Sequence, residues 1–99
     1  MTFVQAAPDR PSLVFFHSPV SGHCRRVEGF LAQVLQRRRN HATFKLVHVS
    51  DEERPDLLEH FGIETLPTLV VVEGNTVRGR LEYPRGCREI EGFLAPWLN

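Results

Sequence analysis

Residues 13–24 read Leu-Val-Phe-Phe-His-Ser-Pro-Val-Ser-Gly-His-Cys, and this stretch decides the fold. It opens with an unbroken apolar run at residues 13–16, which is typical of a short strand covered on both faces of a sheet. We take residues 12–17 as that strand. From Ser21 onward, after a turn, the apolar positions recur every three or four residues, as one face of an amphipathic helix requires. We therefore expect a helix from Ser21 to about Arg39, with Ser21 as its N-cap.

Strand and helix signals go on alternating to the end of the chain. The predicted elements are a strand at residues 44–49, a helix from Pro55 that Gly62 ends, strands at residues 68–72 and 76–82, and a helix at residues 86–98 whose final turn Pro96 distorts. A helical crossover makes the first two strands parallel, whereas the tight turn at residues 73–75 makes the last two antiparallel. The predicted order is βαβαββα.

Length, charge and cysteine count limit the class of protein. The 99 residues suit one domain, 1–99, in which residues 1–11 form a lead segment. Twelve Lys and Arg balance twelve Asp and Glu to a net charge of +0, so we expect neither nucleic acid nor a membrane as partner. Two cysteines exclude a disulfide scaffold. With no signal-peptide pattern and no apolar run of about 18–20 residues, we expect a soluble cytoplasmic protein.

Two segments together resemble the thioredoxin family. Residues 13–24 fall where that family carries a strand ending in its Cys-x-x-Cys redox motif. Residues 61–68, Phe-Gly-Ile-Glu-Thr-Leu-Pro-Thr, fall where it has a Gly-Ile…Pro-Thr segment whose proline is cis and packs beside the reactive cysteines. The resemblance implies a minimal thioredoxin-like α/β fold: a four-stranded mixed sheet of order 2-1-3-4 with helices on both faces. The family's own first strand and helix are missing or eroded, since about eleven residues precede the first strand.

The same resemblance implies a binding site at one edge of the sheet. The first and last helices cover the same face, and Cys24, Pro67 and Cys87 lie toward one end of it. In relatives, the groove beside this proline binds an extended protein or peptide segment by backbone hydrogen bonds. The candidate binding residues here are Val20, Gly22, His23, Leu66, Pro67 and Tyr83, and Ser21 also lines the groove. No oligomeric state is predicted.

The motif itself departs from the family. Ser21 stands where a thioredoxin has its attacking cysteine, which leaves Cys24, at the resolving position, as the only thiol of the motif. A serine hydroxyl without an adjacent base does not exchange with a disulfide. Phe15 aligns with the buried acid that moves protons for the resolving thiol, and Val20 aligns with the tryptophan before the motif. His23 matches the histidine of a Cys-Gly-His-Cys sequence, where it stabilises a thiolate that this chain lacks.

Two functions stay open on these residues. In the first, Cys24 and Ser21 are catalytic residues of a monothiol redox-linked protein, and Cys24 is modified or forms a mixed disulfide with a partner. In the second, the chain is a non-catalytic binding module, Ser21 only caps the helix and Cys24 is a small buried hydrophobe. Cys87 is a candidate second thiol, although we expect it to be inert.

No cofactor or metal is predicted. The set that comes closest to a metal site is His17, His23, His48 and Cys24. No pair within it has the i,i+4 spacing by which a helix presents two ligands, so we expect no metal there.

Overall fold

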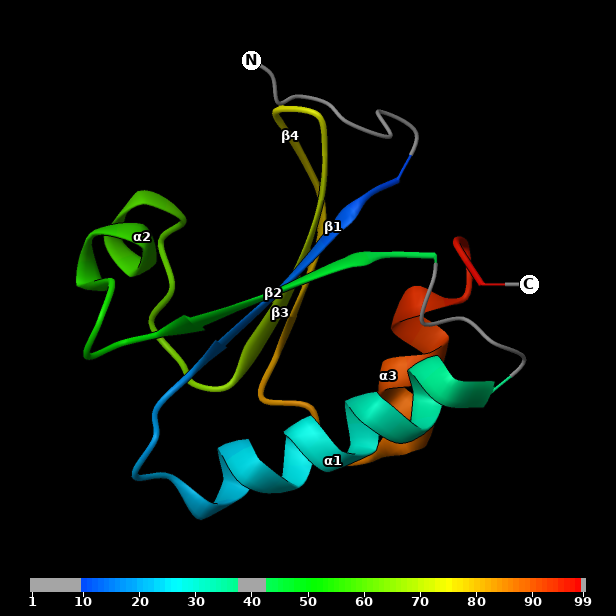
Figure 1. Cartoon of the computed structure of the whole chain (residues 1–99), viewed down its shortest axis with the longest axis horizontal. Helices are drawn as coiled ribbons and strands as arrows, with labels where there is room; N and C mark the ends of the chain where they lie inside the picture. The colour runs from blue at the N-terminus through cyan, green and yellow to red at the C-terminus, as the bar shows by residue number, and fades with distance from the viewer. Residues whose placement is uncertain (1–9, 38–42, 99) are drawn as a thin grey trace.

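The computed structural model describes residues 10–37 and 43–98 (Figure 1). Its elements are β1 (Ser12–His17), α1 (Gly22–Gln36), β2 (Lys45–Ser50), α2 (Pro55–His60), β3 (Thr68–Glu73), β4 (Thr76–Glu82) and α3 (Cys87–Leu94). The strands form one sheet in the order β2-β1-β3-β4. β1 pairs parallel with β2 and antiparallel with β3, and β4 pairs antiparallel with β3. The predicted order and topology are confirmed.

Two helices end earlier than predicted. α1 stops at Gln36, because Arg37 adopts an extended backbone with φ −65° and ψ 133°. Residues 38 and 39, which the predicted helix included, lie outside the described residues. The prediction that the last helix reaches residue 98 was wrong: α3 ends at Leu94, close to Pro96, which has no N–H to continue the ladder. None of the helices in the described ranges has the length and apolar character needed to cross a bilayer.

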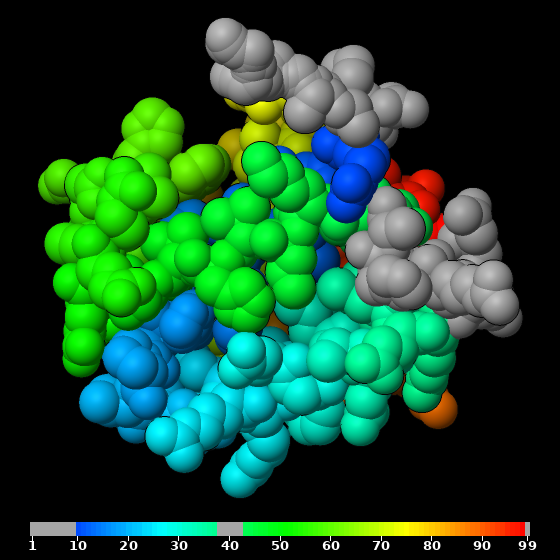
Figure 2. Space-filling view, in the orientation of Figure 1, coloured from blue at the N-terminus to red at the C-terminus, as the bar shows by residue number. Residues whose placement is uncertain are grey.

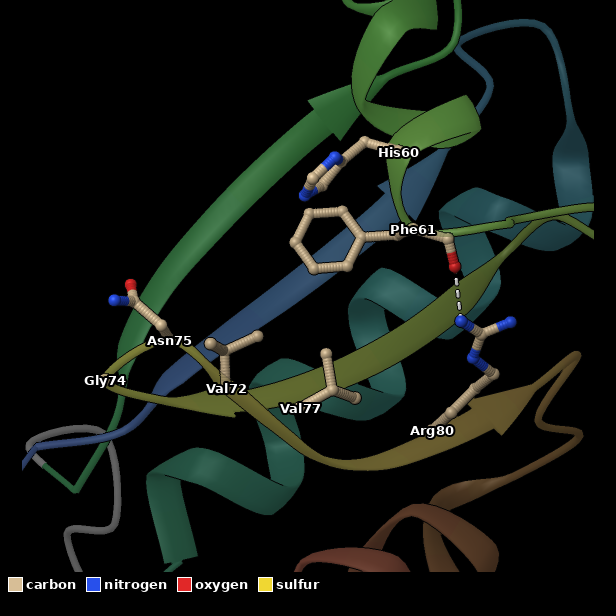
Figure 3. A pocket seen from close by; sticks show the side chains of 7 residues that line it. All are labelled: His60, Phe61, Val72, Gly74, Asn75, Val77 and Arg80. Atoms are coloured by element: carbon tan, nitrogen blue, oxygen red, sulfur yellow. Dashed lines mark hydrogen bonds between the residues drawn. The ribbon is translucent and has the colours of Figure 1, made fainter.

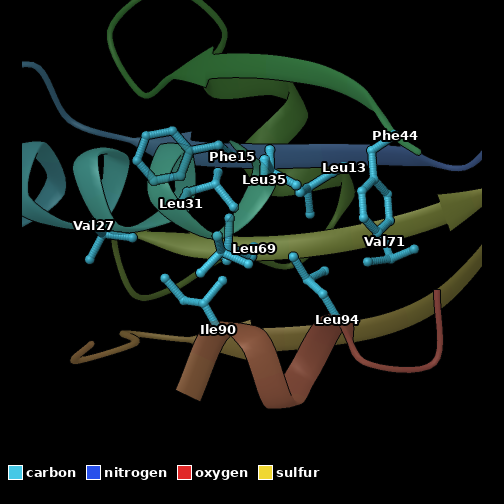
Figure 4. Close-up of a cluster of buried hydrophobic side chains, with 11 residues drawn as sticks. Leu13, Phe15, Val27, Leu31, Leu35, Phe44, Leu69, Val71, Ile90 and Leu94 are labelled. Carbon is cyan, nitrogen blue, oxygen red and sulfur yellow. The ribbon is translucent and has the colours of Figure 1, made fainter. Parts of the chain in front are cut away.

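The main core lies between the sheet and the helix pair α1 and α3 (Figure 4). Leu13 and Phe15 point to this face of β1, because alternate residues of a strand face the same side. The buried members of this cluster are Leu13, Phe15, Val27, Leu31, Val34, Leu35, Phe44, Leu69, Val71, Ile90 and Leu94. Phe30, one of the apolar positions of the predicted helix, is only partly buried against it. The two helices therefore cover the same face of the sheet, as expected.

A second, smaller core lies on the other face. There Val14 and Phe16 of β1 pack with Val49 and Val70, and the partly buried side chains of α2 cover them. Because β1 is covered on both faces, its side chains are apolar at four consecutive positions, which explains the unbroken run at residues 13–16.

The end of α2 turns the chain back toward Pro67. Gly62 has a φ of +66°, a conformation that glycine adopts without steric cost. Its N–H donates to the Glu59 carbonyl at 3.1 Å, and the N–H of Ile63 donates to the Leu58 carbonyl at 2.8 Å. These paired bonds form a Schellman motif, so Gly62 ends the helix as predicted.

Candidate functional site

Ser21 forms the N-cap of α1. Its backbone is extended, with φ −94° and ψ 122°, and its Oγ accepts the N–H of Cys24 at 3.2 Å. Its own N–H donates to the Ser18 carbonyl at 3.2 Å. The hydroxyl is thus directed at the helix backbone and satisfies one of the N–H groups that a helix leaves free in its first turn.

Cys24 lies on the buried side of α1. Only 3% of the residue is exposed, and Val27 and Leu31 follow it on the same face of the helix. Its Sγ accepts the backbone N–H of Ser18 at 3.4 Å, so the chain that leads into the helix folds over the sulfur. The thiol is therefore enclosed by protein.

His23 is tied to the loop that follows β4. Its ring stacks on Tyr83, with ring centroids 4.2 Å apart and planes inclined by 14°. Its Nε2 lies 2.9 Å from the carbonyl oxygen of Pro84. Because a carbonyl oxygen can only accept, Nε2 carries the hydrogen in this contact. The imidazole thus connects the first turn of α1 to the β4–α3 loop through a hydrogen bond and ring stacking.

Pro67 stands between these two segments. The Leu66–Pro67 peptide bond is cis, and the Pro67 carbonyl accepts the N–H of Tyr83 at 2.9 Å. In the sheet, Thr68 pairs with both Phe16 and Glu82, so the end of β1, the start of β3 and the end of β4 share one edge. This register gathers the motif, Pro67 and Tyr83 at that edge.

The surface at this edge is apolar and open. Val20 is 83% exposed and Tyr83 is 43% exposed. A Cβ added at Gly22 would meet nothing within 4 Å, and the blue segment that joins β1 to α1 lies on the outside of the molecule in Figure 2. Pro67 itself is buried at this edge, and we call the exposed residues Val20 and Tyr83, together with this proline, the Pro67 surface. Leu66, a further candidate residue, packs instead with the core on the α2 face.

The sulfur of Cys87 contacts the middle of α1 and not the motif. Cys87 begins α3, and its Sγ is 3.2 Å from Oε1 of Gln33 and 3.7 Å from the carbonyl oxygen of Phe30. Phe30 is six residues beyond Cys24, which is about 9 Å along the axis of α1. The sulfur of Cys87 therefore faces the middle of the helix, and both cysteines are free thiols in this structure.

Phe15, the residue that the resemblance aligns with a buried acid, places an aromatic ring in the larger core. It is 1% exposed, and its ring lies 5.1 Å from that of His17 and 5.6 Å from that of His48. No carboxyl group therefore stands at this position to exchange protons with Cys24. Within residues 10–37 and 43–98, no three His, Cys, Asp or Glu side chains are placed to hold a metal ion.

A groove that the sequence did not suggest lies between α2 and the β3–β4 hairpin (Figure 3). Its volume is about 610 Å³, and its lining residues are His60, Phe61, Val72, Gly74, Asn75, Val77 and Arg80. The guanidinium of Arg80 donates to the carbonyl oxygens of Phe61 and Gly62, at the end of α2. A register shift between Val71 and Val72 changes how β4 alternates against β3. Because of this irregularity, the strict alternation of apolar and polar residues expected along a strand does not reveal which side chains of the hairpin line the groove.

Comparison with known proteins gives a consistent result. The family model for thioredoxin matches residues 2–96. The chain is 33% identical over 66 residues to Thioredoxin 1 of Nostoc sp., covering 67% of this chain and 60% of that protein. It is 31% identical over 64 residues to thioredoxin of Synechocystis sp., covering 65% and 58% respectively. The chain thus spans about six tenths of the length of these curated relatives.

Solved structures agree in fold. The solution structure of reduced desulfothioredoxin from Desulfovibrio vulgaris Hildenborough has a TM-score of 0.74 and 26% identity, covering 88% of this chain and 81% of that one. The germline-specific thioredoxin Deadhead of Drosophila melanogaster has a TM-score of 0.78 at 14% identity, covering 91% and 83%. At that low identity the second likeness concerns the fold alone.

Proposed function

Because this chain belongs to the thioredoxin family, we propose that it is a peptide-binding member that keeps the Pro67 surface and does not perform dithiol–disulfide exchange. One observation carries the proposal: Cys24, the only thiol of the motif, is 3% exposed. An exchange reaction needs a thiolate that can reach the sulfur of another disulfide, and a buried structural cysteine is inert in this sense.

The neighbours of Cys24 support the same function. The Ser21 hydroxyl occupies the position of the attacking thiol and is engaged as a helix cap at 3.2 Å from the Cys24 nitrogen. Cys87 does not restore a two-thiol cycle, because its sulfur contacts Gln33 and Phe30 in the middle of α1. With neither an attacking nor a resolving thiol available, binding is the activity that the site retains.

Exposed apolar side chains support a binding role. Val20 and Tyr83 are large hydrophobic residues in contact with solvent at the edge of the sheet where Pro67 lies. An apolar side chain of an extended peptide would remove both from water, and such burial is the usual centre of a binding interface.

Two measurements test the proposal. The first is the rate at which iodoacetamide alkylates each thiol of the native chain, with Cys87, which is partly exposed, as the internal control. We expect Cys24 to react at least tenfold more slowly than Cys87, and at an equal rate once the chain is unfolded. Equal rates in the native chain would contradict the proposal.

The second measurement is binding to an array of random short peptides. A matched pair of variants separates thiol chemistry from surface contact: Cys24→Ala should keep the pattern of bound peptides, whereas Val20→Glu should lose it. If Cys24→Ala lost peptide binding while its thermal unfolding curve matched that of the native chain, binding would depend on the thiol and the proposal would be contradicted.

A second function, monothiol redox chemistry, has one observation in its favour. The backbone N–H of Ser18 points at the sulfur of Cys24 at 3.4 Å, and a thiolate could accept that bond. In that function the Cys24 thiolate attacks a disulfide of a partner, forms a mixed disulfide and releases the other partner sulfur as a thiolate. Incubation of the native chain with glutathione disulfide, followed by intact mass, would reveal one glutathionyl group on Cys24 if this function holds.

A further inference from the structure

The two segments that flank the Pro67 surface carry charge of one sign. Residues 18–27 and 83–88 hold four arginines and no aspartate or glutamate. These arginines are all exposed: Arg25, Arg26, Arg85 and Arg88. None of them takes part in an ion pair within the described parts of the chain, where the arginines that do pair are Arg37, Arg54, Arg78 and Arg80.

Direct contacts hold these two segments together. The ring of His23 stacks on Tyr83 and its Nε2 bonds to the Pro84 carbonyl, so the start of α1 is connected to the β4–α3 loop. Tyr83 in turn donates its N–H to Pro67. The four arginines lie within four residues of His23 or Pro84 in the chain, and we call them the arginine rim.

The three carboxylates that adjoin the two segments in the chain contact other groups. Glu28 lies 3.9 Å from Nδ1 of His48, and Glu82 lies 3.8 Å from Arg80. Oε1 of Glu89 accepts the backbone N–H of Arg85 at 2.8 Å. Within the described residues, none of these three carboxylates forms an ion pair with Arg25, Arg26, Arg85 or Arg88.

Negative charge gathers on the opposite side. Residues 51–64, which form the β2–α2 loop, α2 and the start of the return to Pro67, contain one arginine and six carboxylates: Asp51, Glu52, Glu53, Asp56, Glu59 and Glu64. Although the net charge of the chain is +0, the arginine rim is positive and residues 51–64 are negative. A charged ligand would be attracted on one side of Pro67 and repelled on the other.

We propose that the Pro67 surface binds an acidic peptide segment, with an apolar residue on Val20 and Tyr83 and with aspartate or glutamate residues on the arginine rim. This inference rests on the proposed function and names the class of its partner. Guanidinium groups pair with carboxylates through two parallel hydrogen bonds, which adds orientation to attraction. The carboxylates of residues 51–64 set that orientation, because they repel the acidic part of the peptide from the α2 side.

The test uses two fluorescent peptides that share one central leucine and differ in their flanks, which are Asp and Glu in the first and Lys in the second. We expect the acidic peptide to bind native chain at least tenfold more tightly at low salt. In 1 M salt, where charges are screened beyond about 3 Å, the difference should fall below threefold. Equal affinities at low salt would overturn the inference and leave the proposed function standing, whereas no binding of either peptide would count against both.

Charge reversal locates the contact. The double variant Arg25→Glu, Arg26→Glu should abolish the preference for the acidic peptide. The pair Arg85→Glu, Arg88→Glu, in the β4–α3 loop and the first turn of α3, gives an independent test if the first variant unfolds. Arg78→Glu is the matched control, because Arg78 pairs with Glu73 on the hairpin. A preference that survives both reversals would overturn the inference. So would a single-stranded oligonucleotide that binds the native chain and displaces the acidic peptide, since the rim would then be a nucleic-acid site.

Discussion

The imidazole of His23 lies flat against the phenol ring of Tyr83, with centroids 4.2 Å apart. Because Tyr83 has a φ of +48°, its side chain leaves the β4–α3 loop in a direction that an ordinary backbone would not give it. The stacked pair and the hydrogen bond from His23 to Pro84 connect two segments that are about 60 residues apart in the chain. The geometry of the Pro67 surface depends on this connection.

Replacement of Tyr83 should separate its backbone role from its side-chain role. Both Tyr83→Gly and Tyr83→Ala remove the stacking on His23, but only glycine adopts a positive φ without cost. We therefore expect Tyr83→Ala to be less stable than Tyr83→Gly by about 1 kcal/mol in urea unfolding. Equal stabilities would show that the loop does not need the left-handed conformation. Both variants should bind peptides more weakly than the native chain.

Ser21 should contribute to stability as a cap. Ser21→Ala removes the acceptor for the Cys24 N–H and is expected to lower the free energy of unfolding by about 1 kcal/mol. Ser21→Asp, which keeps an acceptor at the N-cap, serves as the control and should stay close to the native value. An unchanged stability in Ser21→Ala would mean that the hydroxyl has no capping role.

Ser21→Cys should rebuild a two-thiol motif. We expect the introduced thiol to form a disulfide with Cys24 on oxidation, detected by mass and by the loss of free thiols. Reductase activity, measured on a model disulfide, should be slow because Phe15 cannot transfer protons to Cys24. In the matched variant Ser21→Cys, Cys24→Ser neither the disulfide nor the activity should appear. Failure to form the disulfide in Ser21→Cys would show that the loop no longer brings the two positions together.

Replacement of Phe15 and of Phe30 should lower the free energy of unfolding by different amounts. Phe15 is 1% exposed within the larger cluster, so Phe15→Ala is expected to cost about 3–5 kcal/mol. Phe30 is only partly buried against the same cluster, and Phe30→Ala should cost clearly less. Chemical denaturation of the two variants gives the comparison. An equal loss in both would contradict the packing described for α1.

The Arg54–Asp56 pair should make a small, salt-sensitive contribution to pH dependence. The hydrogen bond from Arg54 lowers the pKa of Asp56 from its ordinary value of 3.8. A carboxyl group whose pKa is lowered in the folded chain stabilises it above the ordinary pKa, and this effect is lost as the pH falls through the folded pKa. Stability measured against pH should therefore fall less steeply below 3.8 in Asp56→Asn than in the native chain. Identical profiles would show that the pair contributes nothing.

The fold was predictable because its signals are local. A four-residue apolar run identifies β1 as a strand covered on both faces, and the cap at Ser21 depends only on the next three residues. The end of α3 was missed for a physical reason: Trp97 packs against the same core as the helix, so the apolar pattern continues past the point where the helical backbone stops.

The site was predictable only in part. The register of the sheet carries Pro67 and the motif to one edge, and this follows from topology. Two other features depend on contacts between side chains that are far apart in the sequence. These are the stacking of His23 on Tyr83 and the contact of the Cys87 sulfur with Gln33, which lies 54 residues away in the chain. A positive φ at a tyrosine has no sequence signal, because glycine and asparagine are the residues that usually adopt it.

The contacts of Arg80 bear on how α2 unfolds locally. α2 has only six residues, none of them buried, and the side chain of Arg80 from β4 donates to the carbonyl oxygens of Phe61 and Gly62, the two residues that follow the helix. Detachment of α2 from the sheet would separate these carbonyl groups from the edge strand β4. We therefore expect local unfolding of α2 to be coupled to fraying of β4, so that the amides of these two elements exchange with solvent at similar rates.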